Sequence, residues 1–242
     1  MAESESGARA FRDGAIDAWR LPAWLLGLSM MGVGPLARDV GYPLIGAVLS
    51  TVLVWAGPAQ VVFFGMIGAG ASLPATAIAV TLSAVRLLPM TAALMPQLRA
   101  GNPSRATLLL ASHFIAVTVW VESMRRLPNL PAEKRRPYFF GLAFACCATA
   151  SLTTALGYLL AGEAPKAIGA GLLFMTPVFF TLSLIAGARL RADWIAIGCG
   201  FALTAALGLF LGSAAALFLT GVIGGTIAFL WERREYARKA AA

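Results

Sequence analysis

The sequence predicts an all-α integral membrane protein, and three observations support this fold class. Hydrophobic residues make up 59% of the 242 residues and charged residues only 12%, whereas ordinary globular chains carry about 25% charged residues. The mean hydropathy is +0.79. The apolar residues also fall into long runs, and about 20 such residues in a helix span a hydrocarbon core of about 30 Å. So few charged side chains cannot cover the surface of a soluble protein of this size.

Eight apolar runs meet or approach the length of a membrane-spanning helix. They are residues 21–36, 42–71, 73–96, 106–124, 138–161, 167–188, 194–212 and 213–231. The first run is short, and only a tight turn at Gly212 and Ser213 separates the last two. We therefore predict about eight transmembrane helices, with seven as the alternative. The expected organisation is a cytoplasmic N-terminal segment (1–20), a polytopic transmembrane domain (21–231) and a basic cytoplasmic tail (232–242).

The distribution of Lys and Arg predicts the orientation. With eight crossings and a cytoplasmic N-terminus, 14 of the 19 basic residues lie in cytoplasmic segments, four lie in external loops, and Arg86 lies inside a run. The positive-inside rule favours this arrangement, with both termini in the cytoplasm. Seven crossings would move the basic tail outside. Because the basic residues lie between apolar runs rather than on one stripe, the net charge of +8 indicates no nucleic-acid partner, and membrane lipids are the expected surroundings.

The N-terminal segment and the cysteines allow simpler predictions. Phe11, Ala15 and Trp19 recur at helical spacing among charged residues, which indicates a short interfacial helix on the cytoplasmic face; a frayed N-terminus is the alternative. The three cysteines, at positions 146, 147 and 199, lie in apolar runs without metal or redox spacing. We expect them to be small core residues, and we expect no metal and no cofactor.

The run 42–71 is too long for one perpendicular helix, and Gly57-Pro58 divides it. Pro58 has no N–H, so the carbonyl of Val54 loses its helical partner. The helix that starts after the break would direct free N–H groups and a positive dipole end at its surroundings. Gln60 is the strongly polar side chain beside the break. This pattern suits a carboxylate-binding site at Gly57, Pro58 and Gln60, and a plain proline kink is the alternative.

Arg86 lies near the centre of the run 73–96. An arginine at this depth costs about 2.5–3.5 kcal/mol on insertion scales, so it should face a partner or a cavity. Pro89 frees the carbonyl of Val85 beside it, and Ser83 lies on the same helical face. We predict that Arg86 and Ser83 belong to a substrate-anion site; a structural hydrogen-bond network is the alternative.

Two further features come from the fourth run and the second half. His113 is the only histidine, which excludes a multi-histidine metal site; it either relays protons or forms a hydrogen bond within the bundle. Glu122 is expected to pair with neighbouring arginines. Thr176 and Pro177 mark a second break, 119 residues after Pro58. That spacing indicates an internal repeat of the kind transporters use, and chance similarity is the alternative.

With these residues in view, the chain resembles the AzlC-type (azaleucine-resistance) family of branched-chain amino acid exporters. The resemblance begins at Phe11-Arg-Asp-Gly14, is densest at Trp55-Ala-Gly-Pro-Ala-Gln60 and at 81–94, and continues through Phe174-Met-Thr-Pro177. It implies a multi-span bacterial inner-membrane protein that works with a small four-span subunit of the AzlD type. It also implies export of leucine, valine, isoleucine and sometimes methionine, with Arg86 at the family's intramembrane arginine.

The chain departs from the family pattern at several polar positions. Ala84, Leu87 and Met90 replace an asparagine, a histidine and a tyrosine around the arginine, and Ser112-His113 replaces an acidic pair. Leu173 stands where many members have an acid before the second-half proline. These departures make the expected site more apolar and less acidic than is usual in the family.

The leading functional hypothesis is the large subunit of a secondary transporter, not an enzyme, that exports branched-chain or other apolar amino acids. The substrate carboxylate would lie between Arg86 and the start of the half-helix at Ala59-Gln60, and the carbonyls near Val54 and Val85 would accept the ammonium. A non-transporting membrane scaffold and a transporter of a different small substrate are the alternatives. A serine protease is disfavoured because the one histidine adjoins Ser112 on its own helix, and no phosphate-binding Gly-rich loop indicates an ATPase.

Overall fold

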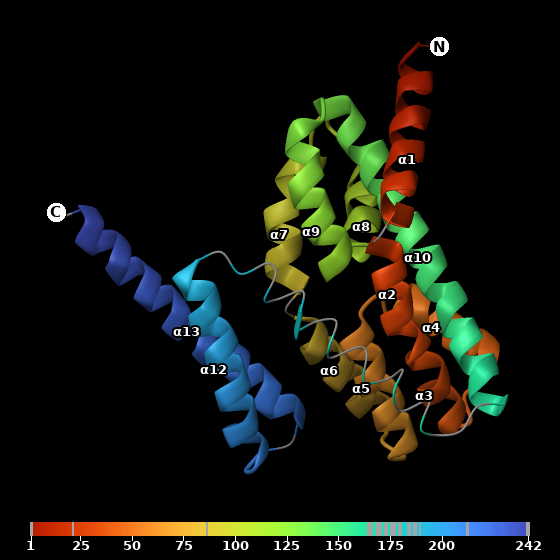
Figure 1. Cartoon of the computed structure of the whole chain (residues 1–242), viewed down its shortest axis with the longest axis vertical. Helices are drawn as coiled ribbons and strands as arrows, with labels where there is room; N and C mark the ends of the chain where they lie inside the picture. Colours follow the sequence, from red (N-terminus) through yellow and green to blue (C-terminus); the bar gives the residue numbers. More distant parts are fainter. Residues whose placement is uncertain are drawn as a thin grey trace. The chain divides into compact units, whose positions relative to one another are not determined.

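The structure is a computed structural model that describes residues 2–20, 22–85, 87–163, 190–211 and 213–240, with single positions between 167 and 188. Every regular element in these residues is a helix, which confirms the all-α class. The chain divides into two compact units, Met1–Thr176 and Pro177–Ala242. Figure 1 shows the helices of each unit.

The long helix α10 (Ala132–Glu163) is the axis of the first unit, and three consecutive helices pack along it: α1 (Ala2–Arg20), α2 (Pro22–Met31) and α3 (Val33–Asp39). Gly14 of α1 lies against the backbone of Tyr138, and Gly34 of α3 lies against the backbone of Tyr158. Glycine is needed at both positions because a Cβ there would overlap backbone atoms. Since both pairs advance in the same direction along the chain, α1–α3 run parallel to α10, as Figure 1 also shows.

The N-terminal segment is helical from Ala2 to Arg20, so its conformation is that of the helix alternative and not of a frayed end. Ala10 and Ala18 are buried, while Trp19 is 57% exposed. The ring of Phe11 approaches that of Phe144 on α10, with the centroids 6.2 Å apart. The placement of α1 at a membrane surface stays a prediction.

The run 42–71, predicted to contain a break, is not one continuous helix. It folds into two short helices, α4 (Leu44–Leu53) and α5 (Gly57–Gly68). Tyr42, just before α4, contacts the rings of Phe63 and Phe64 near the end of α5. Gly68 likewise lies against the side chain of Val40. The chain therefore returns to the end from which it started, and α4–α5 form a helical hairpin (Figure 1).

The run 106–124 is divided in the same way. Helices α8 (Arg105–His113) and α9 (Val117–Arg126) are bent by 119° at the break between them, and a short 3-10 turn, η1 (Leu127–Asn129), follows α9. So large an angle turns the chain back on itself. Residues His113 and Glu122, predicted to share one helix, consequently lie on the two different arms of a second hairpin.

Helices α6 (Leu73–Ala84) and α7 (Leu87–Leu98) connect the two hairpins and are bent by 54°. Helix α6 packs against α5, and Gln97 near the end of α7 accepts a hydrogen bond of 2.8 Å from Arg135 at the start of α10. The pair therefore runs from the Tyr42 end of the unit to the Arg135 end, antiparallel to α10.

By length and composition, one described helix segment, Ala132–Ala161, is long and apolar enough to cross a membrane, and the count rises to three if each bent pair is taken as one span. Cys146 and Cys147 on α10 are buried, as predicted, whereas Cys199, also predicted to be a core residue, is only half-buried. Many large apolar side chains on the other helices face outward, for example Ile45 at 74% exposure and Leu73 at 80%.

The second unit contains α12 (Arg191–Gly208) and α13 (Ser213–Ala240), which pack against each other. The carboxylate of Asp193 accepts a hydrogen bond of 2.8 Å from the Leu190 N–H and so caps the start of α12. Gly224 of α13 approaches the Cβ of Cys199 closely. Helix α13 continues to Ala240, so the tail predicted for residues 232–242 begins as helix.

Candidate functional site

The tips of the two hairpins, where α4 turns into α5 and α8 into α9, are in contact. Two side chains donate hydrogen bonds to backbone carbonyls that lie 59 and 61 residues away in the sequence. The indole Nε1–H of Trp55 donates to the carbonyl of Phe114 over 3.0 Å. His113 Nε2 lies 2.8 Å from the carbonyl oxygen of Val52, and since a carbonyl only accepts, this nitrogen carries the proton. The rings of Trp55 and Phe114 are also in contact, with the centroids 6.4 Å apart. Each tip therefore holds the other.

The two tips share one backbone pattern, offset by 60 residues. At the first tip the Ala56 N–H donates to Val54 O, and at the second the Ala116 N–H donates to Phe114 O. Ala56 and Ala116 are both extended N-caps that offer no side-chain hydrogen bond to the helix that follows. The first-turn amides of α5 and α9 have no intrahelical partners, so two positive helix ends start at the meeting point of the tips.

Gln60, in the first turn of α5, is fully buried. Its Nε2 donates to Val54 O over 3.2 Å, so the side chain folds back toward the tip. Within the described part of the chain its Oε1 has no hydrogen-bond partner. A buried acceptor without a donor is costly, so this atom calls for a partner such as a bound ligand or an ordered water.

The carbonyls that the prolines free are already used by the chain. Val54 O accepts from both Gln60 Nε2 and the Ala56 N–H. Val85 O accepts from the Leu88 N–H over 3.0 Å. Because a carbonyl oxygen has two lone pairs, both of those on Val54 O are occupied in this structure, and the role of the carbonyls near Val54 and Val85 in binding the ammonium stays a prediction. The open acceptor is Gln60 Oε1.

The other predicted site residues divide into three groups. Gly57 is buried and Pro58 half-buried at the start of α5. Ser83 is half-buried and donates to Val80 O over 2.8 Å, within its own helix. Arg86, Thr176 and Pro177 lie outside the described residues. The internal repeat predicted from the 119-residue spacing of Pro58 and Pro177 therefore lies outside them too.

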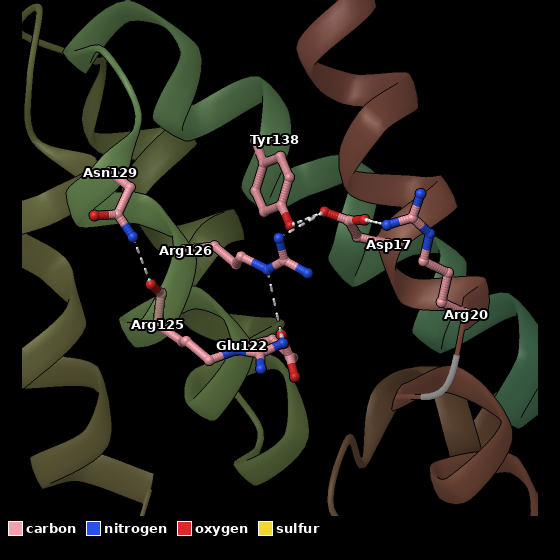
Figure 2. A network of polar contacts seen from close by, with 7 residues as sticks. All are labelled: Asp17, Arg20, Glu122, Arg125, Arg126, Asn129 and Tyr138. Carbon is pink, nitrogen blue, oxygen red and sulfur yellow. Dashed lines mark hydrogen bonds and ion pairs between the residues drawn. The ribbon is translucent and has the colours of Figure 1, made fainter.

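A second polar cluster joins α1, α9 and α10 (Figure 2), and the sequence predicted only its ion pairs at Glu122. Asp17 accepts a hydrogen bond of 2.8 Å from the Tyr138 hydroxyl and pairs with Arg20 at 3.2 Å and Arg126 at 3.7 Å. Arg126 also lies 3.9 Å from Glu122.

Glu122 pairs in addition with Arg125 at 2.7 Å, so the predicted pairing of Glu122 with its arginine neighbours is confirmed. The contacts of Asp17 had no sequence signal, because Tyr138 is 121 residues away. The cluster fixes the base of the second hairpin to both α1 and α10. Among the described residues no three histidine, cysteine or acidic side chains lie close enough to hold a metal ion.

Broken helices that meet tip to tip inside an apolar helical bundle are typical of membrane channels and transporters, where irregular backbone lines a cavity. The chain matches the family model described as AzlC protein over residues 23–163 and thus belongs to the AzlC family. The match includes both hairpins and the connecting helices and ends where α10 ends.

The family is associated with membrane transport of small molecules, generally with a partner subunit, and not with enzymatic activity. No curated protein and no solved structure matches the chain.

Proposed function

We propose that this chain is the large subunit of a secondary transporter that exports branched-chain or other apolar amino acids, and that its substrate site lies at the start of α5. The observation that carries the proposal is the buried Gln60, whose unpaired Oε1 lies beside a positive helix end at the meeting point of two hairpins. An amino acid brings a carboxylate for the first-turn amides of α5 and an ammonium for Gln60 Oε1.

We include Arg86 in this proposed site on the basis of its position in the sequence. It lies between Val85 and Leu87, where α6 ends and α7 begins. Its guanidinium would pair with the substrate carboxylate. An apolar wall would take the side chain, and one methylene in such a pocket is worth about 1–3 kcal/mol, so discrimination between valine, leucine, isoleucine and methionine is modest.

We propose a topology in which α2–α3, α6–α7 and α10 cross the membrane, α1 lies on the cytoplasmic side, and the two hairpins enter the membrane from opposite sides. With crossings by 167–188, α12 and α13, the chain has six crossings, and both termini are cytoplasmic. The loop that carries Arg99 and Arg105 then becomes cytoplasmic. Sixteen basic residues lie inside, and only Arg38 and Lys166 lie outside, a stronger positive-inside bias than that of eight crossings.

The outward-facing apolar side chains support a membrane location, which for a bacterial protein of this family is the inner membrane. Exposed apolar surface of this extent needs a cover of lipid or protein. We propose that lipids cover most of it and that a small four-span subunit of the AzlD type covers part.

The test is efflux of labelled leucine, valine and methionine from preloaded cells that carry this chain with and without a candidate small subunit. Gln60→Leu removes the acceptor and should slow leucine efflux about 10- to 150-fold, which corresponds to about 1.5–3 kcal/mol for a hydrogen bond to a charged group. Arg86→Ala should abolish efflux. Gln97→Leu, the other glutamine, lies at the far end of α7 and serves as the matched control.

Wild-type efflux rates in both Arg86→Ala and Gln60→Leu would refute the site. No efflux of any of the three amino acids, with the protein confirmed in the membrane, would favour a different substrate or a non-transporting scaffold.

A further inference from the structure

A cavity of about 690 Å³ lies beside the cluster of Figure 2, at the end of the first unit opposite to Tyr42. One face of α1, the turn after α9 and the first turns of α10 form its walls. Its polar lining residues are Ser6, Arg9, Asp13, Asp17, Arg126, Asn129, Lys134 and Tyr138. This volume falls in the range of small-molecule sites, about 300–1,000 Å³. In the proposed topology the cavity opens at the cytoplasmic end.

The charged residues of the cavity differ in whether they already have ion-pair partners. Asp17 and Arg126 pair with each other and with further partners, so they form a neutralised wall. Neither the Asp13 carboxylate nor the Lys134 ammonium has an ion pair or side-chain hydrogen bond within the described residues. Arg9, a further cation of the lining, already has a partner. Of the charged lining residues, Asp13 on α1 and Lys134 on α10 are therefore the ones without an ion pair among the described residues.

The remaining wall is apolar and comes from Ala10, Leu130 and Pro131. A ligand that matches the cavity carries an anion for Lys134, a cation for Asp13 and an apolar portion for this wall. An inorganic phosphate would pair with Lys134 but would bring no cation for the Asp13 carboxylate. A zwitterionic amino acid with an apolar side chain supplies all three features in one small molecule.

We infer that this cavity is a second, cytoplasmic amino-acid site, at which the transported zwitterion binds before it reaches the start of α5. The inference depends on the proposed function for the identity of the ligand. The substrate carboxylate pairs with Lys134, the ammonium pairs with Asp13, and the apolar side chain packs on Leu130 and Pro131. A ligand held there bridges α1 and α10 beside Arg126, at the base of the hairpin whose tip contacts the first hairpin.

The experiment is equilibrium binding of tritiated leucine to the purified full chain in detergent. The Gln60→Leu form, which weakens the site at α5, should retain saturable binding. In that background Asp13→Asn and Lys134→Gln should each weaken the remaining binding about fivefold, as expected for single pairs of partly exposed charges. The controls Asp39→Asn and Arg99→Gln change the same charges outside the cavity and should have no effect.

Two analogues assign the contacts. 4-Methylpentanoate lacks the amine, and isoamylamine lacks the carboxylate. Asp13→Asn should reduce the preference for leucine over 4-methylpentanoate, and Lys134→Gln should reduce the preference for leucine over isoamylamine. Preferences that neither substitution changes overturn the second site and leave the site at α5 intact.

Other outcomes separate the two proposals. If Gln60→Leu removes all leucine binding, there is no second site. If the wild-type chain, with its partner subunit present, binds no leucine, the proposed function fails and the second site fails with it. If phosphatidylethanolamine nanodiscs abolish the binding that detergent permits, a zwitterionic lipid headgroup occupies the cavity, and the inference is overturned.

Discussion

Replacing Trp55 by phenylalanine removes the hydrogen bond between the hairpin tips while an aromatic ring stays in place. The indole N–H donates to Phe114 O over 3.0 Å, and the Trp55 side chain is only 7% exposed. The phenyl ring preserves most of the aromatic contact with Phe114. Phe114 O keeps its second donor, the Ala116 N–H, so the substitution costs the net value of one hydrogen bond, about 0.5–1.5 kcal/mol. This energy is lost from the contact between the tips.

The equilibrium between joined and separated tips should therefore shift about 2- to 12-fold, since 1.4 kcal/mol corresponds to a factor of ten. Amide hydrogen exchange followed by mass spectrometry measures this local opening directly. Peptides that cover residues 54–60 and 114–120 should exchange faster by this factor in Trp55→Phe. Peptides from the middle of α10 should keep their rates, because the core around them is unchanged.

Trp231→Phe is the matched control, because Trp231 lies on α13 and is 55% exposed. Two results would refute the reasoning. Unchanged exchange at both tips would show that this hydrogen bond does not hold them together. Equal acceleration at the tips and in α10 would show that the substitution destabilises the whole unit rather than the contact between the hairpins.

Two further predictions concern the packing of α1 on α10. Gly141→Ala places a Cβ against the backbone of α1 and should lower stability by about 1–3 kcal/mol; thermal melting measures this, and Gly65→Ala, which meets nothing within 4 Å, should not lower it. Tyr138→Phe removes the donor to Asp17 and should cost about 1.5–3 kcal/mol, seen as faster hydrogen exchange in α1. Unchanged exchange there would contradict a role for this bond in holding α1.

Several features of the fold were predictable because their causes are local. Apolar runs and the scarcity of charge identified the helical class, and Gly57-Pro58 marked a real helix break, since proline removes a hydrogen bond wherever it stands. The break at Phe114–Ala116 has no proline or glycine, and it was missed. Gln60 was recognised as polar inside an apolar run, but its two amide atoms have different roles that only their neighbours define.

By itself, the sequence determined that this protein is helical, that its helices are apolar, and that its basic residues gather between them, because hydropathy and charge are properties of single residues. The tertiary structure decided whether each broken run continues in one direction or turns back. A run of about 20 to 30 apolar residues has the same hydropathy whether it forms one span or two half-length helices. The choice depends on contacts such as Tyr42 with Phe64, Trp55 with Phe114 and Asp17 with Tyr138, which join residues that folding alone brings together.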